Sequence, residues 1–124
     1  MGGNEKIMIK LKNILQEGSE SEVISFETFA SKRLEGATKI AMDAKEKGGP
    51  ALLTYNHFVV KLSYYKNASE GNFDIDESKS LLDSKSKEFC DKIYDMNLSE
   101  IEFQRLVGEI EVLGELLLYK NKIK

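Results

Sequence analysis

The chain has 124 residues, of which 41% are hydrophobic and 31% are charged, and its formal net charge at pH 7 is −3. This length and composition indicate one globular domain over residues 1–124 that can fold without metals or disulfides, and they exclude a disordered chain. The mild acidity argues against nucleic acid as a partner, and the sequence has no apolar run of the roughly 20 residues that cross a bilayer.

Residues 1–22 can be read as a loosely attached N-terminal segment. Apolar residues at positions 7, 9 and 11 alternate as they do in a strand, whereas those at 7, 11, 14 and 15 follow helical spacing. We predict a short helix that ends at Gly18, and then a polar, acidic loop.

A long helix is predicted to begin near Ser25, a good N-cap residue, and to end at about Lys47. Most of its apolar stripe is alanine, which lets another helix approach closely; the stripe consists of Phe26, Ala30, Ala37, Ile40, Ala41 and Ala44. The Gly48-Gly49-Pro50 sequence predicts a turn between helices, since no Gly-Lys-Ser/Thr follows it as in a phosphate-binding loop.

Three further helices are predicted by their periodicity and capping residues. The first runs from Ala51 to about Ala68, before Gly71-Asn72. The second begins at Asp74, which forms a capping box with Glu77, and continues through apolar residues at 82, 89, 93 and 96. The last begins with a capping box of residues 99 and 102 and ends in lysines 120, 122 and 124. The sequence therefore predicts an all-α fold, a small helical bundle of about four main helices, with a short N-terminal helix or strand before it.

The helix after Pro50 is rich in polar aromatic and amide side chains, which suit a ligand pocket or an interface. Its candidate ligand-binding residues are Tyr55, Asn56, His57 and Tyr64. His57 is the only histidine and Cys90 the only cysteine, so the ligands of a zinc site or of a di-iron Glu-x-x-His site are missing. We predict no catalytic residue, no metal and no cofactor. The lone cysteine favours a reducing compartment, and we expect a cytoplasmic protein.

The last helix has the spacing of a coiled-coil-like seam, which we expect at the centre of the core. The seam consists of Phe103, Leu106, Ile110, Leu113 and Leu117. Other apolar residues lie beside it, and two interior glycines suggest that another backbone comes close. These residues form the predicted interface with a second copy or another protein: Val107, Gly108, Gly114, Leu116 and Leu118.

Residues Ile9-Lys10-Leu11-Lys12-Asn13-Ile14-Leu15, closing with Glu17, resemble the opening of many small accessory proteins of large tailed bacteriophages. Because the resembling segment begins directly after Met8, the resemblance makes Met8 a candidate natural start and residues 1–7 an upstream extension. The resemblance implies an accessory protein that binds a target in the host cytoplasm, and it implies no activity.

We therefore expect a non-enzymatic protein that binds other proteins through helical surfaces. Its expected partners are a second copy of itself and an unidentified protein, which would be a host protein if the chain is phage-encoded. The alternative is a small-molecule-binding protein or minor enzyme that uses the Tyr55, Asn56, His57 and Tyr64 region. A ligand site predicts a concave pocket into which these side chains point, whereas protein binding predicts an exposed apolar patch.

Overall fold

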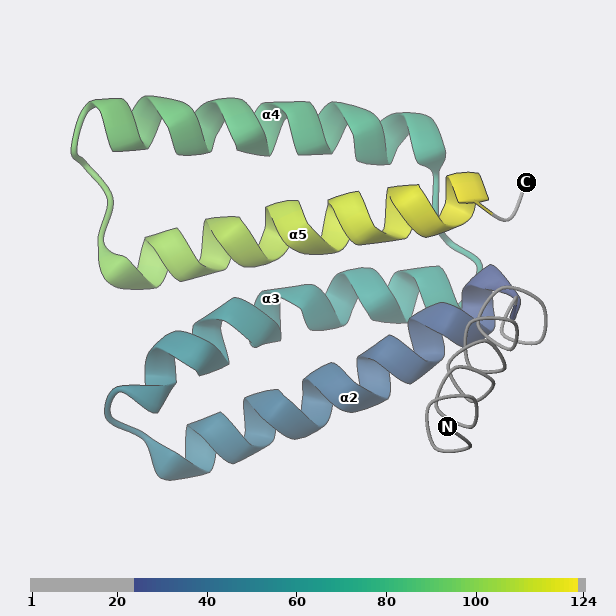
Figure 1. Ribbon diagram of the computed structural model, residues 1–124, viewed down its shortest axis with the longest axis horizontal. Coiled ribbons are helices and arrows are strands. Elements are labelled where there is room, and N and C mark those ends of the chain that lie inside the picture. Colours follow the sequence, from purple (N-terminus) through teal and green to yellow (C-terminus); the bar gives the residue numbers. More distant parts are fainter. Residues whose placement is uncertain (1–23, 123–124) are drawn as a thin grey trace, which may run out of the picture.

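The computed structural model describes residues 24–122, and this part of the chain forms four helices (Figure 1). They are α2 (Phe26–Lys47), α3 (Ala51–Ser69), α4 (Ile75–Tyr94) and α5 (Glu100–Lys122). The structure is a small all-α helical bundle, as the sequence predicts. The short helix or strand expected in the first 22 residues lies outside the described residues. None of the described helices has the length and apolar character of a membrane span.

Side-chain caps begin three of these helices where the sequence places them. The side chain of Ser25 accepts a hydrogen bond from the backbone N–H of Thr28, and that of Asp74 accepts one from Glu77. Ser99 accepts one from the N–H of Glu102 at 3.2 Å. Each cap satisfies a backbone donor that has no partner inside the first helical turn.

The turn between α2 and α3 depends on two glycines. Gly48 has φ 65° and ψ −164°, and Gly49 has φ 56°. Both have backbone conformations that residues with a Cβ rarely adopt. Pro50 follows with φ −60° and precedes the first residue of α3, so its missing N–H removes no helical hydrogen bond. The predicted helix–helix turn is confirmed.

The four helices lie side by side in the order α2, α3, α5, α4 (Figure 1). Neighbours in sequence form two antiparallel hairpins, α2–α3 and α4–α5, and the hairpins pack through α3 and α5, which run parallel to each other. Hydrogen bonds between α3 and α5 show this parallel register, because Asn56 pairs with Arg105 and Tyr65 with Glu115. Within the described residues, α4 contacts only α5 among the helices.

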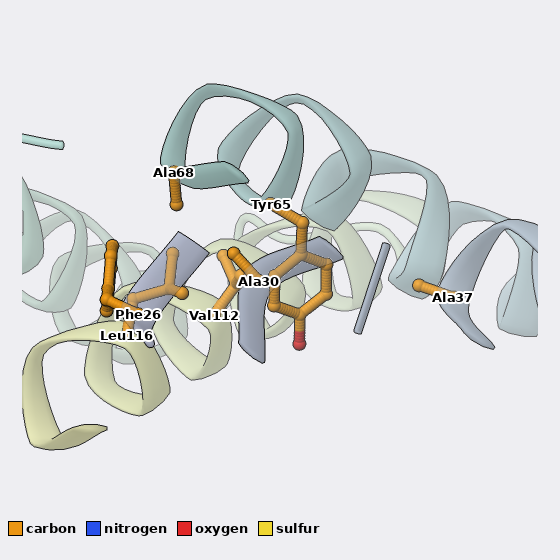
Figure 2. Packing of buried hydrophobic residues seen from close by; sticks show 7 residues of the cluster. All are labelled: Phe26, Ala30, Ala37, Tyr65, Ala68, Val112 and Leu116. Atoms are coloured by element: carbon orange, nitrogen blue, oxygen red, sulfur yellow. The ribbon is translucent and has the colours of Figure 1, made fainter. Parts of the chain in front are cut away.

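The core lies where α2, α3 and α5 meet (Figure 2). Its central cluster is drawn from all three helices: Phe26, Ala30, Ala37, Tyr65, Ala68, Val112 and Leu116. Alanines on α2 let α3 approach closely, as the sequence predicts. The largest fully buried side chains are Leu113, Leu116 and Val112, and all three belong to α5. The last helix therefore supplies the bulk of the buried aliphatic volume.

The structure corrects several expected core positions. Ile40 on α2, which belongs to the predicted apolar stripe, is 42% exposed. On α5 only Leu106 and Leu113 of the predicted seam are buried, whereas Phe103 is 38% exposed. Leu116, which lies outside the predicted seam and belongs to the predicted interface, is fully buried. The reason is that α5 packs mainly against two helices, α3 and α4. Its buried face is therefore wider than a single coiled-coil seam and is not centred on the predicted one.

The end of α4 also differs from the expected helix. α4 stops at Tyr94, and Met96, which was expected to continue its apolar stripe, is 91% exposed in the following turn. No residue of α4 is fully buried. Because α5 alone covers this helix, its apolar residues are only partly shielded from solvent.

Candidate functional site

The interface between α3 and α5 contains a row of polar side chains. On α3, residues 57, 61 and 65 are spaced four apart and therefore lie on one face of the helix. This face meets Glu111 and Glu115 of α5, which are also four apart. The parallel packing of α3 and α5 brings these two sets to the same level. These charge-assisted bonds join residues that are 50 or 54 positions apart in the sequence.

His57 contacts a carboxylate rather than a nucleophile. Its Nε2 lies 2.9 Å from Oε1 of Glu111, and the side chain is mostly buried. The Nδ1 atom is buried without a hydrogen-bond partner. A tautomer with the proton on Nε2 donates to Glu111 and leaves Nδ1 unprotonated, so no buried N–H lacks an acceptor. Glu111 could not be predicted as the partner from the sequence, since only the packing of α3 against α5 brings the two residues together.

Lys61 is a buried lysine that shares the same carboxylate. Only 8% of the residue is exposed, and its Nζ donates to Oε1 of Glu111 at 2.8 Å. The ammonium also lies 5.0 Å from the ring centre of Phe58, at a distance typical of a cation–π contact. Partial burial acts to raise the pKa of Glu111, but the hydrogen bond and charge of Lys61, together with His57, outweigh it and lower that pKa.

Tyr65 forms the next polar contact between α3 and α5. Its ring is buried in the central cluster, and its hydroxyl donates to Oε1 of Glu115 at 2.5 Å. Burial is the main reason that the pKa of Tyr65 is raised, and the bond to Glu115 adds to the effect. Arg33 of α2 approaches the other oxygen of Glu115, with Nε at 3.5 Å. This contact links α2, α3 and α5 through one carboxylate.

The four candidate ligand-binding residues do not converge on one cavity. Asn56 is buried, donates to the carbonyl oxygen of Leu52 at 2.8 Å and accepts from Arg105 at 3.0 Å. His57 bonds to Glu111, and Tyr55 is partly buried. Tyr64 packs against the core cluster, and burial, followed by the charge of Glu109, raises its pKa. The polar groups of Asn56 and His57 thus hold α3 against α5.

An open groove lies between α2 and α5. It has a volume of about 620 Å³, and Lys61 of α3 lines it from between the two helices. Its apolar lining comes from Phe29, Ile110, Leu118 and Tyr119, with Arg33, Glu111, Glu115 and Lys122 as its charged residues. None of the four candidate ligand-binding residues lines this groove. The groove instead follows α5, which is the helix whose surface the sequence singled out.

The outward face of α5 is apolar. Val107, Ile110, Gly114 and Leu118 recur at three- and four-residue spacing and lie on one side of the helix. We call these four residues the α5 row. The first three are partly buried, and Leu118 is 74% exposed. Three of the four residues, Ile110, Gly114 and Leu118, line the open groove beside α2, so this part of the row is open to solvent.

The predicted interface residues divide into two groups. Gly108 and Leu116 are buried inside the chain, so neither offers a surface to another molecule. Val107, Gly114 and Leu118 belong to the α5 row. Gly108 does mark a close backbone approach, but the neighbour is α3: a Cβ at this position would overlap the carbonyl oxygen of His57. At Gly114 a Cβ would meet no atom within 4 Å.

No family model, curated protein or solved structure matches this chain. Among the described residues, no cluster of three or more His, Cys, Asp and Glu side chains could hold a metal ion. Cys90 is exposed on α4, which does not contact α3, and it therefore does not pair with His57.

Proposed function

We propose that this protein is a non-enzymatic binding protein that recognises other proteins, including a second copy of itself, through the outward face of α5. The observation that carries the proposal is the α5 row, an apolar stripe with one large aliphatic residue 74% exposed at its end. Stripes of this kind on a folded domain mark surfaces that another protein covers. The adjoining groove provides an apolar concavity with charges of both signs at its sides.

The polar residues of α3 support this proposal over a ligand site. Asn56, His57 and Lys61 are engaged by partners on α5 or α3, so binding a ligand there would require breaking bonds that join the two hairpins. By contrast, no side chain of the α5 row takes part in a hydrogen bond or ion pair among the described residues, so binding there breaks none of these bonds. Association through the outward face of α5 therefore requires less rearrangement of the folded chain than binding among the polar residues of α3.

The phage resemblance of residues 9–17 suggests a setting for this binding. We propose an accessory protein that works in the bacterial cytoplasm and acts on a host protein, in keeping with the lone Cys90.

The test compares what the wild type and Leu118→Glu variant capture. Each protein is immobilised and exposed to bacterial lysate, and the bound proteins are identified by mass spectrometry. We expect the wild type to retain a specific protein that Leu118→Glu does not, because a carboxylate without a partner is costly to bury in an interface. Tyr94→Glu is the matched control, since Tyr94 is 88% exposed and lies at the end of α4, away from the row. Equal capture by all three proteins would refute the proposal.

A further inference from the structure

We propose that two copies of the chain pack their α5 helices against each other, antiparallel, about a two-fold axis at Gly114. This inference rests on the proposed function, in which the α5 row is a protein-binding surface, and it names the partner and the geometry.

The order of residues in the row is self-complementary. Ile110 lies four residues before Gly114, and Leu118 lies four residues after it. These three positions form a ridge of the i±4 type, the kind that packs against a like ridge in globular proteins at about −50°. When a second copy is placed antiparallel at Gly114, Ile110 of each copy meets Leu118 of the other. The same patch then serves both partners, as a two-fold interface requires.

Gly114 is suited to the crossing point. A Cβ there would meet no atom within 4 Å, so the absence of a side chain serves no contact within the described part of the chain. Glycine in a helix interior costs about 1 kcal/mol relative to alanine. At Gly108 the close approach of α3 accounts for that cost. At Gly114 the corresponding close approach would be made by the second copy.

The charges beside the row permit this contact. The row itself carries no charged residue, and the nearest acids, Glu111 and Glu115, line the groove along one edge. Each acid is already paired within its own chain, Glu111 with Lys61 and Glu115 with Arg33. The edges of two copies can therefore meet without an uncompensated cluster of like charges.

The size of the surface predicts a weak dimer. The row from Val107 to Leu118 extends over about 17 Å of helix at 1.5 Å per residue. A single helix crossing of this length is smaller than the roughly 800 Å² per partner of a standard stable interface. We therefore expect reversible association, with the average mass rising from one chain at about 10 µM towards two chains at about 1 mM.

Disulfide trapping tests the position of the axis. The test variant carries Gly114→Cys together with Cys90→Ser, which removes the native thiol. At the two-fold axis the new thiol of one copy lies beside the same thiol of the other copy, so the two should form a disulfide under a mild oxidant. Asn121→Cys in the same background is the matched control, since it lies on the same helix about 10 Å from the axis. In an antiparallel pair the two copies of residue 121 are about 21 Å apart, too far for a disulfide. Efficient trapping at 114 and not at 121 supports the proposal.

Each other outcome overturns the proposed antiparallel dimer in a defined way. Equal trapping at 114 and 121 indicates parallel packing. A mass that stays at one chain up to about 1 mM removes the second copy as partner, and the proposed function survives if capture still depends on Leu118. If neither association nor capture depends on Leu118, both proposals fail. A disulfide within one chain between Leu11→Cys and Gly114→Cys would assign the row to the chain's own N-terminal segment.

Discussion

The two interior glycines of α5 occupy opposite environments, which gives a paired prediction. Gly108→Ala should lower the free energy of unfolding by about 1–3 kcal/mol, because the added methyl overlaps the His57 carbonyl and lies 2.7 Å from a methyl carbon of Val60. Gly114→Ala should raise it by about 0.5–1 kcal/mol, because nothing opposes the added methyl and alanine favours the helix. Urea denaturation at a few micromolar, where we expect the monomer, measures both changes. Changes of the same sign in both variants would contradict this packing.

The carboxylate that joins His57 and Lys61 gives a prediction about pH. The pKa of Glu111 in the folded protein lies below its ordinary value of 4.5. Its contribution to stability is therefore complete above that ordinary value and is lost as the pH falls through the lower, folded pKa. Glu111→Gln should be less stable than the wild type at pH 7, and the difference should shrink as the pH falls below about 4.5. Urea midpoints of the two proteins between pH 7 and pH 3 test this, and a constant difference would contradict it.

At the level of single residues, the sequence predicts some roles and not others. The interior glycine at position 108 correctly predicted that another backbone packs closely against α5. Glycine lowers the stability of a helix relative to alanine, so its presence there indicates a steric requirement. The roles of Ile40 and Leu116 were wrong, since spacing shows which residues share a face but not which face is covered. The partners of His57 and Lys61 could not be predicted at all. Their contact with Glu111 depends on how two hairpins are placed side by side.

At the level of elements, α3 and α4 end with the same backbone motif built from different residues. After α3, the N–H of Asn72 bonds to the carbonyl of Asn67, and Gly71 has φ 82°. After α4, the N–H of Asn97 bonds to the carbonyl of Lys92, and Met96 has φ 52°. Both are Schellman turns, in which glycine normally occupies the left-handed position.

The methionine in the second turn therefore stores strain that glycine would relieve. Met96→Gly should raise the free energy of unfolding by about 0.5–1 kcal/mol, since the side chain is 91% exposed and little packing is lost. The reciprocal change, Gly71→Met, should lower it by about 1 kcal/mol. Thermal or urea unfolding of both variants provides the measurement. A loss of stability in Met96→Gly would show that the methionine side chain stabilises the folded protein.

Helix boundaries were predictable because capping is local. A side chain at the N-cap and a backbone N–H three residues later are set by a few neighbouring torsions, so Ser25, Asp74 and Ser99 could be identified from the sequence. The end of α4 was not, because the left-handed position there carries methionine instead of the expected glycine. The apolar spacing continued past the turn and suggested a longer helix.

At the level of the whole molecule, the fold class could be predicted and the arrangement could not. Helical periodicity and short connections favour antiparallel neighbours, and both hairpins follow that rule. The parallel contact between α3 and α5 brings together helices that are separated by α4 in sequence, and no local signal encodes it. The candidate binding face follows from this arrangement, because the α5 row borders the open groove between α2 and α5.

The position of α4 at the edge of the bundle has a consequence for motion. Its attachment to α5 consists of partly exposed contacts, chiefly the Phe89–Phe103 ring pair and the lysine–glutamate bridges of Lys85 and Lys92. We expect a helix held in this way to form a foldon of its own, which opens while the other three helices stay folded. Native-state hydrogen exchange should show α4 amides opening at a lower free energy than those of α3 and of the buried side of α5. Exchange of all four helices only through global unfolding would contradict this. Each such opening would uncover a further side of α5 to a passing partner.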